Sequence, residues 1–83
     1  MDYATLTPAF GRVLRQQRIQ AQLTQEQLAL MADVQRNYVS ELERGLKQAS
    51  VITLFKLASA LGVPPHEFVR LLSEEVVAKS EPS

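Results

Sequence analysis

The stretch that decides the fold spans residues 24–45 and reads TQEQLALMADVQRNYVSELERG. It opens with Thr24 and Gln27 at the spacing of a capping box, in which each side chain bonds the backbone N–H of the other residue at a helix start. Apolar residues follow at helical spacing, so a short helix is predicted over Gln25–Ala32.

A second short helix is predicted over Arg36–Arg44, with Val39 and Leu42 on its inner face. Gly45 follows it, where a residue in the left-handed conformation commonly ends a helix. About three residues join the two helices, which is the geometry of a helix-turn-helix. Residues 24–45 therefore predict this motif.

Three more helices are predicted outside the motif from caps and apolar periodicity. Thr7 precedes a proline at the first helical position, Ser50 is a good N-cap, and Gly62 ends an amphipathic pattern. The expected bounds are about 8–20, 51–61 and 65–78. Residues 79–83 are expected to form a disordered tail. The predicted fold is all-α, a compact domain of five helices over residues 1–78.

Composition excludes several classes of protein. The chain has 83 residues, enough for one small domain. It has no cysteine, which excludes disulfides and thiolate metal sites, and its single histidine argues against a metal or catalytic cluster. No apolar run approaches the ~20 residues that span a bilayer, and residues 1–10 lack the pattern of a signal peptide. The expectation is a soluble cytoplasmic protein without a cofactor.

The formal net charge is zero, which by itself weakens a nucleic-acid interpretation. The charges are unevenly distributed, however. Residues 1–62 hold seven basic and five acidic residues, a net +2, whereas residues 63–83 hold two basic and four acidic residues, a net −2. This asymmetry fits a chain that uses one face for DNA and another for a different purpose.

A family resemblance rests on several short segments with a specific joint spacing. They are Arg18-Ile19, Leu23-Thr24-Gln25, Leu28-Ala29, Val34, residues 38–45, Leu54, Leu57-Ala58 and Leu61-Gly62-Val63. With this spacing, residues 10–70 resemble the lambda-repressor/Cro-type (XRE-like) helix-turn-helix family, which includes phage repressors and the controller proteins of restriction–modification systems. The resemblance implies a lambda-repressor-like domain that binds double-stranded DNA and regulates transcription.

Five residues are candidates for reading bases. Gln35, Arg36 and Asn37 stand at the start of the second motif helix, where side chains reach base edges, and Ser40 and Glu41 follow one turn later. Arginine pairs with guanine, and asparagine or glutamine with adenine. Glu41 is open to three roles: accepting from cytosine, holding Arg36, or repelling phosphates. The alternative is ordinary polar surface or contact with phosphates alone.

Five residues are candidates for phosphate contacts. Thr24 and Gln25 open the first motif helix, whose free N–H groups and dipole favour an anion. The resemblance places Tyr38 at the boundary with a phosphate, and Arg44 and Lys47 follow the second motif helix. Four of them have a plainer alternative: Gln25 as surface, Tyr38 as a half-buried core residue, and the two cations as solvated loop residues.

The resemblance also implies a partly buried ion pair between Arg18 and Glu43. Such a pair adds little net stability over an apolar pair, yet removing one partner is costly. Both residues are interpreted as structural. Gln35 departs from the family pattern, in which serine or threonine commonly caps this helix, so the start of the second motif helix is left open.

The last helix carries more apolar residues than one small core can use, which favours a dimer interface. The candidate interface residues are Val69, Leu71, Leu72 and Val76. A two-fold dimer would place two recognition helices about 34–36 Å apart and read a palindrome. The alternative is a monomer with a frayed C-terminal end.

Three functions are compatible with these features. The first is a sequence-specific transcriptional regulator, a repressor or a controller. The second is an antitoxin that represses its own operon and binds a toxin, and the third is a protein-interaction module without DNA affinity. If the chain also binds another protein, the expected partner is a toxin or a polymerase. The sequence offers no nucleophile with a base, no paired carboxylates and no metal-ligand spacing, so an enzyme is not expected.

Overall fold

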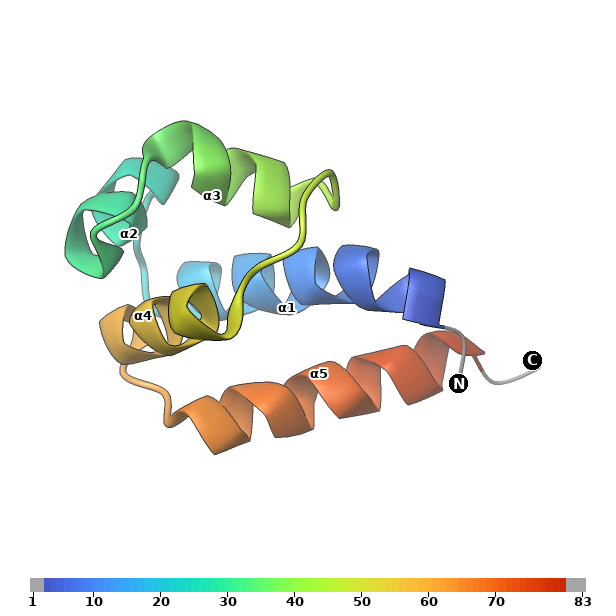
Figure 1. Ribbon diagram of the computed structural model, residues 1–83. Coiled ribbons are helices and arrows are strands. Elements are labelled where there is room, and N and C mark those ends of the chain that lie inside the picture. The colour runs from blue at the N-terminus through green and yellow to red at the C-terminus, as the bar shows by residue number, and fades with distance from the viewer. Residues whose placement is uncertain (1–2, 81–83) are drawn as a thin grey trace.

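Every regular element that the computed structural model describes, over residues 3–80, is a helix, so the fold is all-α. A short 3-10 helix, η1, precedes five α-helices (Figure 1). Their bounds are Tyr3–Thr5 for η1, Leu6–Gln20 for α1, Gln25–Ala32 for α2, Arg36–Glu43 for α3, Val51–Leu61 for α4 and Pro65–Ser80 for α5.

Three of the predicted helix ends are formed by interactions between residues close in the sequence. The Thr24 hydroxyl accepts from the Gln27 N–H at 3.0 Å, and the Gln27 side chain accepts from the Thr24 N–H at 2.8 Å, so the capping box is complete. The Ser50 hydroxyl accepts from the Thr53 N–H at 3.0 Å and caps α4. Gly62 ends α4 with a φ of 71°, a conformation that costs glycine little.

The predicted bounds of three helices differ from the observed ones. Helix α1 begins at Leu6 rather than Pro8, with Thr7 inside it, because a proline anywhere in the first turn removes only an N–H that has no partner there. Helix α3 ends at Glu43, one residue early. Helix α5 continues through Lys79 to Ser80, so the expected disordered tail is wrong for those two residues, and residues 81–83 lie outside the described part.

The helices stack in three levels. Helix α1 packs against α3 on one side and against α5 on the other, and α4 contacts α2 and α5. Figure 1 shows α3 at one end of the molecule, α1 and α4 at the middle level, and α5 at the opposite end. Arg12 of α1 and Glu75 of α5 form an ion pair, with Nε 2.6 Å from Oε1. The two helices of the motif thus pack against the middle level, α3 against α1 and α2 against α4.

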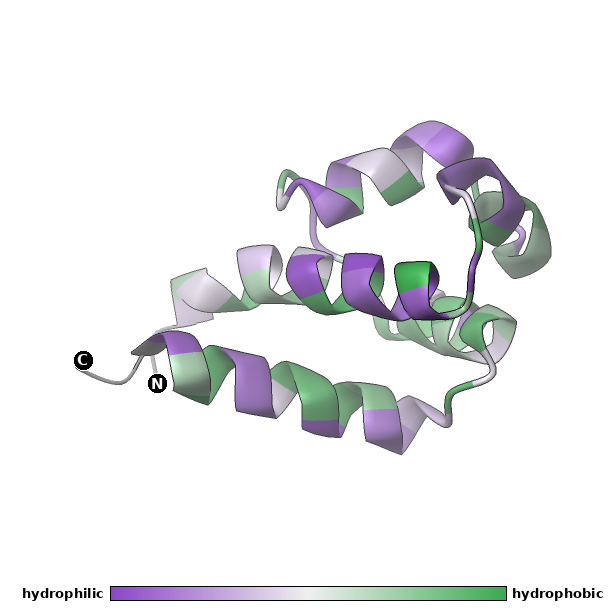
Figure 2. Cartoon of the chain, turned by 180° about the vertical axis from the view of Figure 1, so that it is seen from behind, coloured by the Kyte–Doolittle hydropathy of each residue, from purple (hydrophilic) through white to green (hydrophobic). Residues whose placement is uncertain are grey.

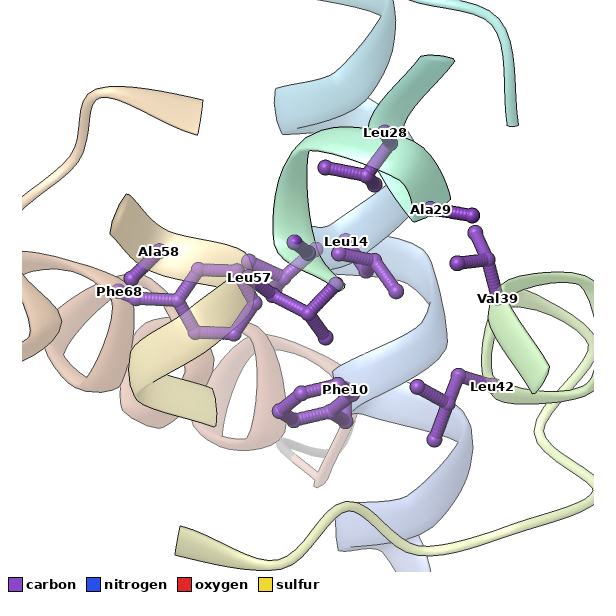
Figure 3. Close-up of a cluster of buried hydrophobic side chains, with 11 residues drawn as sticks. Phe10, Leu14, Leu28, Ala29, Val39, Leu42, Leu57, Ala58 and Phe68 are labelled. Atoms are coloured by element: carbon purple, nitrogen blue, oxygen red, sulfur yellow. The ribbon is translucent and has the colours of Figure 1, made fainter. Parts of the chain in front are cut away.

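The core collects the inner sides of all five α-helices, as Figure 3 shows. Phe10 and Phe68 meet with ring centroids 5.2 Å apart and the rings tilted by 50°. Leu14, Leu28 and Leu57 are fully buried around them. Burying side chains of this size contributes about 1.5–3 kcal/mol each.

Val76 is also part of the interior, with 1% of its surface exposed. The prediction that it belongs to a dimer interface is therefore wrong, because a side chain buried within one copy is not available to a second. The sequence pattern of α5 could not show which of its turns meets α1.

Gly11 explains how closely α1 and α3 approach. A Cβ atom at this position would lie 2.3 Å from the Leu42 carbonyl oxygen and 2.7 Å from the Glu43 carbonyl oxygen. Any side chain here would force the two helices apart. Glycine at this position therefore allows the close packing of α1 against α3.

Candidate nucleic-acid interface

The start of α3 presents three polar side chains to solvent. Gln35 precedes the helix with extended backbone, φ −80° and ψ 147°, and its side chain makes no capping bond. Gln35, Arg36 and Asn37 are all exposed, and none of their side chains bonds to another described residue. This end of α3 therefore offers donors and acceptors that folding leaves uncommitted.

The next turn of α3 is more enclosed. Ser40 and Glu41 are half-buried, and the Glu41 carboxylate pairs with Lys47 at 3.5 Å rather than with Arg36. Arg44 is exposed and its Nε donates to the Ser40 carbonyl at 3.4 Å. Asn37, Glu41 and Arg44 border a shallow hollow on the outer side of the helix. The hollow and the uncommitted end form one continuous polar surface.

In the first turn of α2, Gln25 is neither a free phosphate ligand nor an ordinary surface residue. Its side chain is half-buried and Nε2 donates to Glu43 Oε1 at 3.0 Å, a contact that the sequence analysis missed. The spacing of two residues on different helices gives no signal for it. The backbone amides of Gln25 and Glu26 donate to no described residue, so this turn keeps two free donors at the positive end of the helix dipole.

Glu43 joins three helices. Arg18 of α1 donates from Nε to Oε2 at 2.6 Å and from Nη2 to Oε1 at 3.0 Å, while Gln25 of α2 donates to the same carboxylate. The predicted ion pair is therefore present, with 12% of the Arg18 side chain and 2% of the Glu43 side chain exposed. Hydrogen bonding to Glu43 raises the pKa of Arg18 above its ordinary value, although burial opposes the shift.

Arg18 has a second role at the turn before α2. Its Nη1 donates to the Leu23 carbonyl at 2.9 Å, just before the capping box. The guanidinium thus holds the entry to α2 and the end of α3 at the same time. Because both motif helices are tied to α1 through these bonds, the exposed side of α3 has a fixed orientation relative to the start of α2.

Tyr38 secures the loop after α3. Its ring packs against the core, and its hydroxyl donates to the Gln48 carbonyl at 3.3 Å. The loop between these contacts carries Lys47, whose side chain is 55% exposed. Tyr38 is thus half-buried, which agrees with the expected alternative of a half-buried core residue. Its hydroxyl nevertheless stays near the surface.

The comparisons with known proteins bear on the same residues. A protein-family model described as a helix-turn-helix matches residues 14–68. The chain belongs to the helix-turn-helix family. The matched residues contain α2, α3 and α4, and they include each of the base and phosphate candidates named above.

Named relatives of this helix-turn-helix protein are regulators. It is 38% identical over 61 residues to the control protein C.BamHI of Bacillus amyloliquefaciens, covering 72% of this chain and 75% of that one. It is 34% identical over 71 residues to the immunity repressor of Bacillus phage phi105, covering 86% of this chain but 47% of the repressor, about half its length.

A solved structure has the same arrangement of helices. The restriction–modification controller protein C.AhdI of Aeromonas hydrophila superposes with a TM-score of 0.77 at 37% identity, covering 82% of this chain and 99% of that one. The predicted resemblance to repressors and controller proteins is therefore confirmed, as is the all-α fold class. These relatives are regulators rather than enzymes.

Two further structural findings concern other classes of site. No helix within residues 3–80 of this helix-turn-helix protein has the length and apolar character needed to cross a membrane. The described residues also contain no group of three or more histidine, aspartate or glutamate side chains placed to hold a metal ion.

Proposed function

We propose that the protein is a sequence-specific transcriptional regulator, a homodimer that reads a palindromic operator with α3 in the major groove. The observation that carries the proposal is the start of α3, where Arg36 and Asn37 are exposed and uncommitted. Side chains at this place in a recognition helix reach base edges. A regulator of this kind works where the chromosome lies, in the cytoplasm.

In this proposal one group of candidate residues contacts the bases and another contacts the phosphates. Base edges are read by Gln35, Arg36 and Asn37, while Ser40 lets the groove wall approach and Glu41, held by Lys47, accepts from a cytosine amino group.

Phosphates on either side of the groove meet the two ends of the motif. The free amides at Gln25 bind a phosphate at the start of α2, with Thr24 beside them. Beyond α3, Tyr38, Arg44 and Lys47 border the second strand. Phosphate contacts set the register of the protein, and base contacts set its specificity.

The direct test is binding to duplex DNA as salt is varied. Affinity for random duplex should fall linearly with salt on logarithmic axes, with a slope proportional to the number of phosphates neutralised. Footprinting on the DNA upstream of the protein's own gene should then give a protected site with two-fold symmetry. Indifference to duplex at low ionic strength would remove the proposal.

Replacing Arg36 with alanine should remove discrimination at one base position. We expect a loss of about 1–3 kcal/mol at the preferred base and little change in affinity for random duplex, because a bidentate contact to guanine is lost. Competition binding with operators varied one base pair at a time measures this. Arg70→Ala, on exposed α5 at the opposite end of the molecule, is the matched control and should bind as wild type.

Replacing Lys47 with alanine should instead weaken binding to all sequences alike. The side chain is exposed and its attraction to phosphate does not depend on the base sequence, so the salt slope should fall by about 1. Lys79→Ala, a matched loss of one cation on α5, should leave the slope unchanged. A slope unaltered by Lys47→Ala would mean that this lysine serves only its ion pair with Glu41.

The two other functions considered from the sequence have no comparable support. The relatives named above are control proteins and a repressor, and none is an antitoxin or an interaction module without DNA affinity. A toxin or polymerase partner is likewise unsupported by these relatives. The regulator is the function retained.

A further inference from the structure

Arg15 is a charged residue of α1 that folding leaves uncommitted. Its side chain is exposed, and no ion pair or hydrogen bond within the part of the chain that the structure describes includes it. The other two arginines of α1 are both paired, Arg12 with Glu75 of α5 and Arg18 with Glu43 of α3. Among the described residues, Arg15 is therefore the arginine of α1 whose charge serves no contact within the fold.

Arg15 lies on the side of α1 that borders α3 and the start of α2. Gly11, Arg15 and Arg18 follow one another at i, i+4 and i+7, so they share one side of the helix. At Gly11 a Cβ atom would lie 2.7 Å from the Glu43 carbonyl oxygen, so this side faces the end of α3. Arg18 bonds the Glu43 carboxylate and also the Leu23 carbonyl, just before α2. Arg15 stands between them, about 6 Å from Gly11 and about 4.5 Å from Arg18 along the helix axis.

The exposed side of α1 continues to the start of α2. Figure 2 views the molecule from behind and shows this side of α1 mostly in hydrophilic colours, with the chain rising from the end of α1 to the start of α2. The backbone amides of Gln25 and Glu26 at that start donate to no described residue and lie at the positive end of the helix dipole. Two sources of positive potential, a guanidinium and a helix start, therefore border one surface.

Two carboxylates come from the helices around this surface, and neither pairs with Arg15. The Glu43 side chain is 2% exposed, and its two oxygens accept from Arg18 and Gln25. The exposed Glu26 shares its side of α2 with Leu30, four residues further on and 82% exposed, whereas Gln25 faces Glu43. The charge of Arg15 is therefore available to an anion from outside the chain.

We propose that Arg15 binds a DNA phosphate, on the strand that also meets the start of α2. This inference rests on the proposed function, because it takes the duplex to lie against α2 and α3. Phosphates of one strand follow one another about every 3.4 Å along the duplex axis, so a strand held at the start of α2 brings neighbouring phosphates past α1. The guanidinium is a planar fork of N–H donors that can bond two phosphate oxygens at once. The DNA-binding surface thus extends from the helix-turn-helix onto α1.

The test is the salt dependence of binding to random duplex, measured for Arg15→Gln and Arg15→Lys. Both variants should fold with a circular dichroism melt close to wild type, because the side chain is exposed and bonds no described residue. On logarithmic axes, Arg15→Gln should reduce the slope of affinity against salt by about 0.9, the contribution of one phosphate contact. Arg15→Lys keeps the cation and should retain the slope of wild type.

Two further variants separate a direct contact from an effect of net charge. Arg70→Gln makes the same change on the exposed side of α5, at the end of the molecule away from α3, and should leave the slope unaltered. Arg15→Gln combined with Lys47→Ala should lower the slope by about twice the single effect. Lys47 is proposed to bind the other strand, so the two residues contact different phosphates and their losses should add.

Three results would overturn the inference: a wild-type slope for Arg15→Gln, an equal reduction for Arg70→Gln, or no further loss in the double variant. The same measurements separate its failure from that of the proposed function. If wild type binds duplex and Lys47→Ala lowers the slope while Arg15→Gln does not, the inference about Arg15 fails alone. If wild type is indifferent to duplex at low ionic strength, the regulator function fails, and the contact of Arg15 with phosphate fails with it.

Discussion

Replacing Gly11 with alanine is expected to destabilise the fold by about 3 kcal/mol, the upper end of the range for overpacked sites. The added Cβ would meet two backbone carbonyl oxygens of α3, the nearer one at 2.3 Å. Backbone atoms in a helix cannot swing aside as the end of a flexible side chain can, so α1 and α3 would have to separate. Urea unfolding followed by circular dichroism measures the change in the free energy of unfolding.

Gly62→Ala is the matched control for this substitution. Gly62 has a φ of 71°, which strains an alanine by about 1–2 kcal/mol, but nothing lies within 4 Å of the position where its Cβ would be built. We therefore expect the loss at Gly62 to be clearly smaller than the loss at Gly11. Equal losses would mean that conformation, and not the contact with α3, explains why glycine occupies position 11.

The second large effect is expected from Glu43→Ala, which should cost about 3–5 kcal/mol and lower the melting temperature sharply. The substitution leaves the Arg18 guanidinium, 12% exposed, without its carboxylate, and it also removes the acceptor of Gln25. An uncompensated charge in such a place is more costly than the loss of the attraction alone. Thermal unfolding at neutral pH measures the effect.

Glu67→Ala gives the comparison, since Glu67 also pairs with an arginine, Arg70, but on the exposed side of α5. Exposed pairs contribute little, so this variant should melt close to wild type. Glu43→Gln should fall between the two, because an amide retains an acceptor for Arg18 without the charge. An unchanged melt for Glu43→Ala would show that the three-helix junction does not support the fold.

Much of the fold could be predicted from the sequence, because its helix boundaries are encoded locally. The capping box at Thr24 and Gln27, the cap at Ser50 and the left-handed Gly62 each act within four residues, and all three occur as predicted. The start of α1 and the end of α5 could not be predicted in this way. Their limits lack such a signal: Thr5, the residue before α1, makes no side-chain cap bond.

Contacts between distant residues account for the rest of the difference. The bond from Gln25 to Glu43, the ion pair of Arg12 with Glu75 and the burial of Val76 all depend on how whole helices are rotated against each other. An amphipathic pattern defines one apolar stripe, but it does not say which turn of that stripe meets a neighbour.

The antiparallel pairing of α1 with α5 has a practical consequence. The beginning of α1 and the end of α5 lie side by side, at the end of the molecule away from the start of α3 (Figures 1 and 2). A fluorescent tag or an unrelated effector domain fused beyond α5 should therefore leave the start of α3, the side proposed to read bases, unobstructed. Different domains could therefore be fused to the end of α5 without any change to α2 or α3.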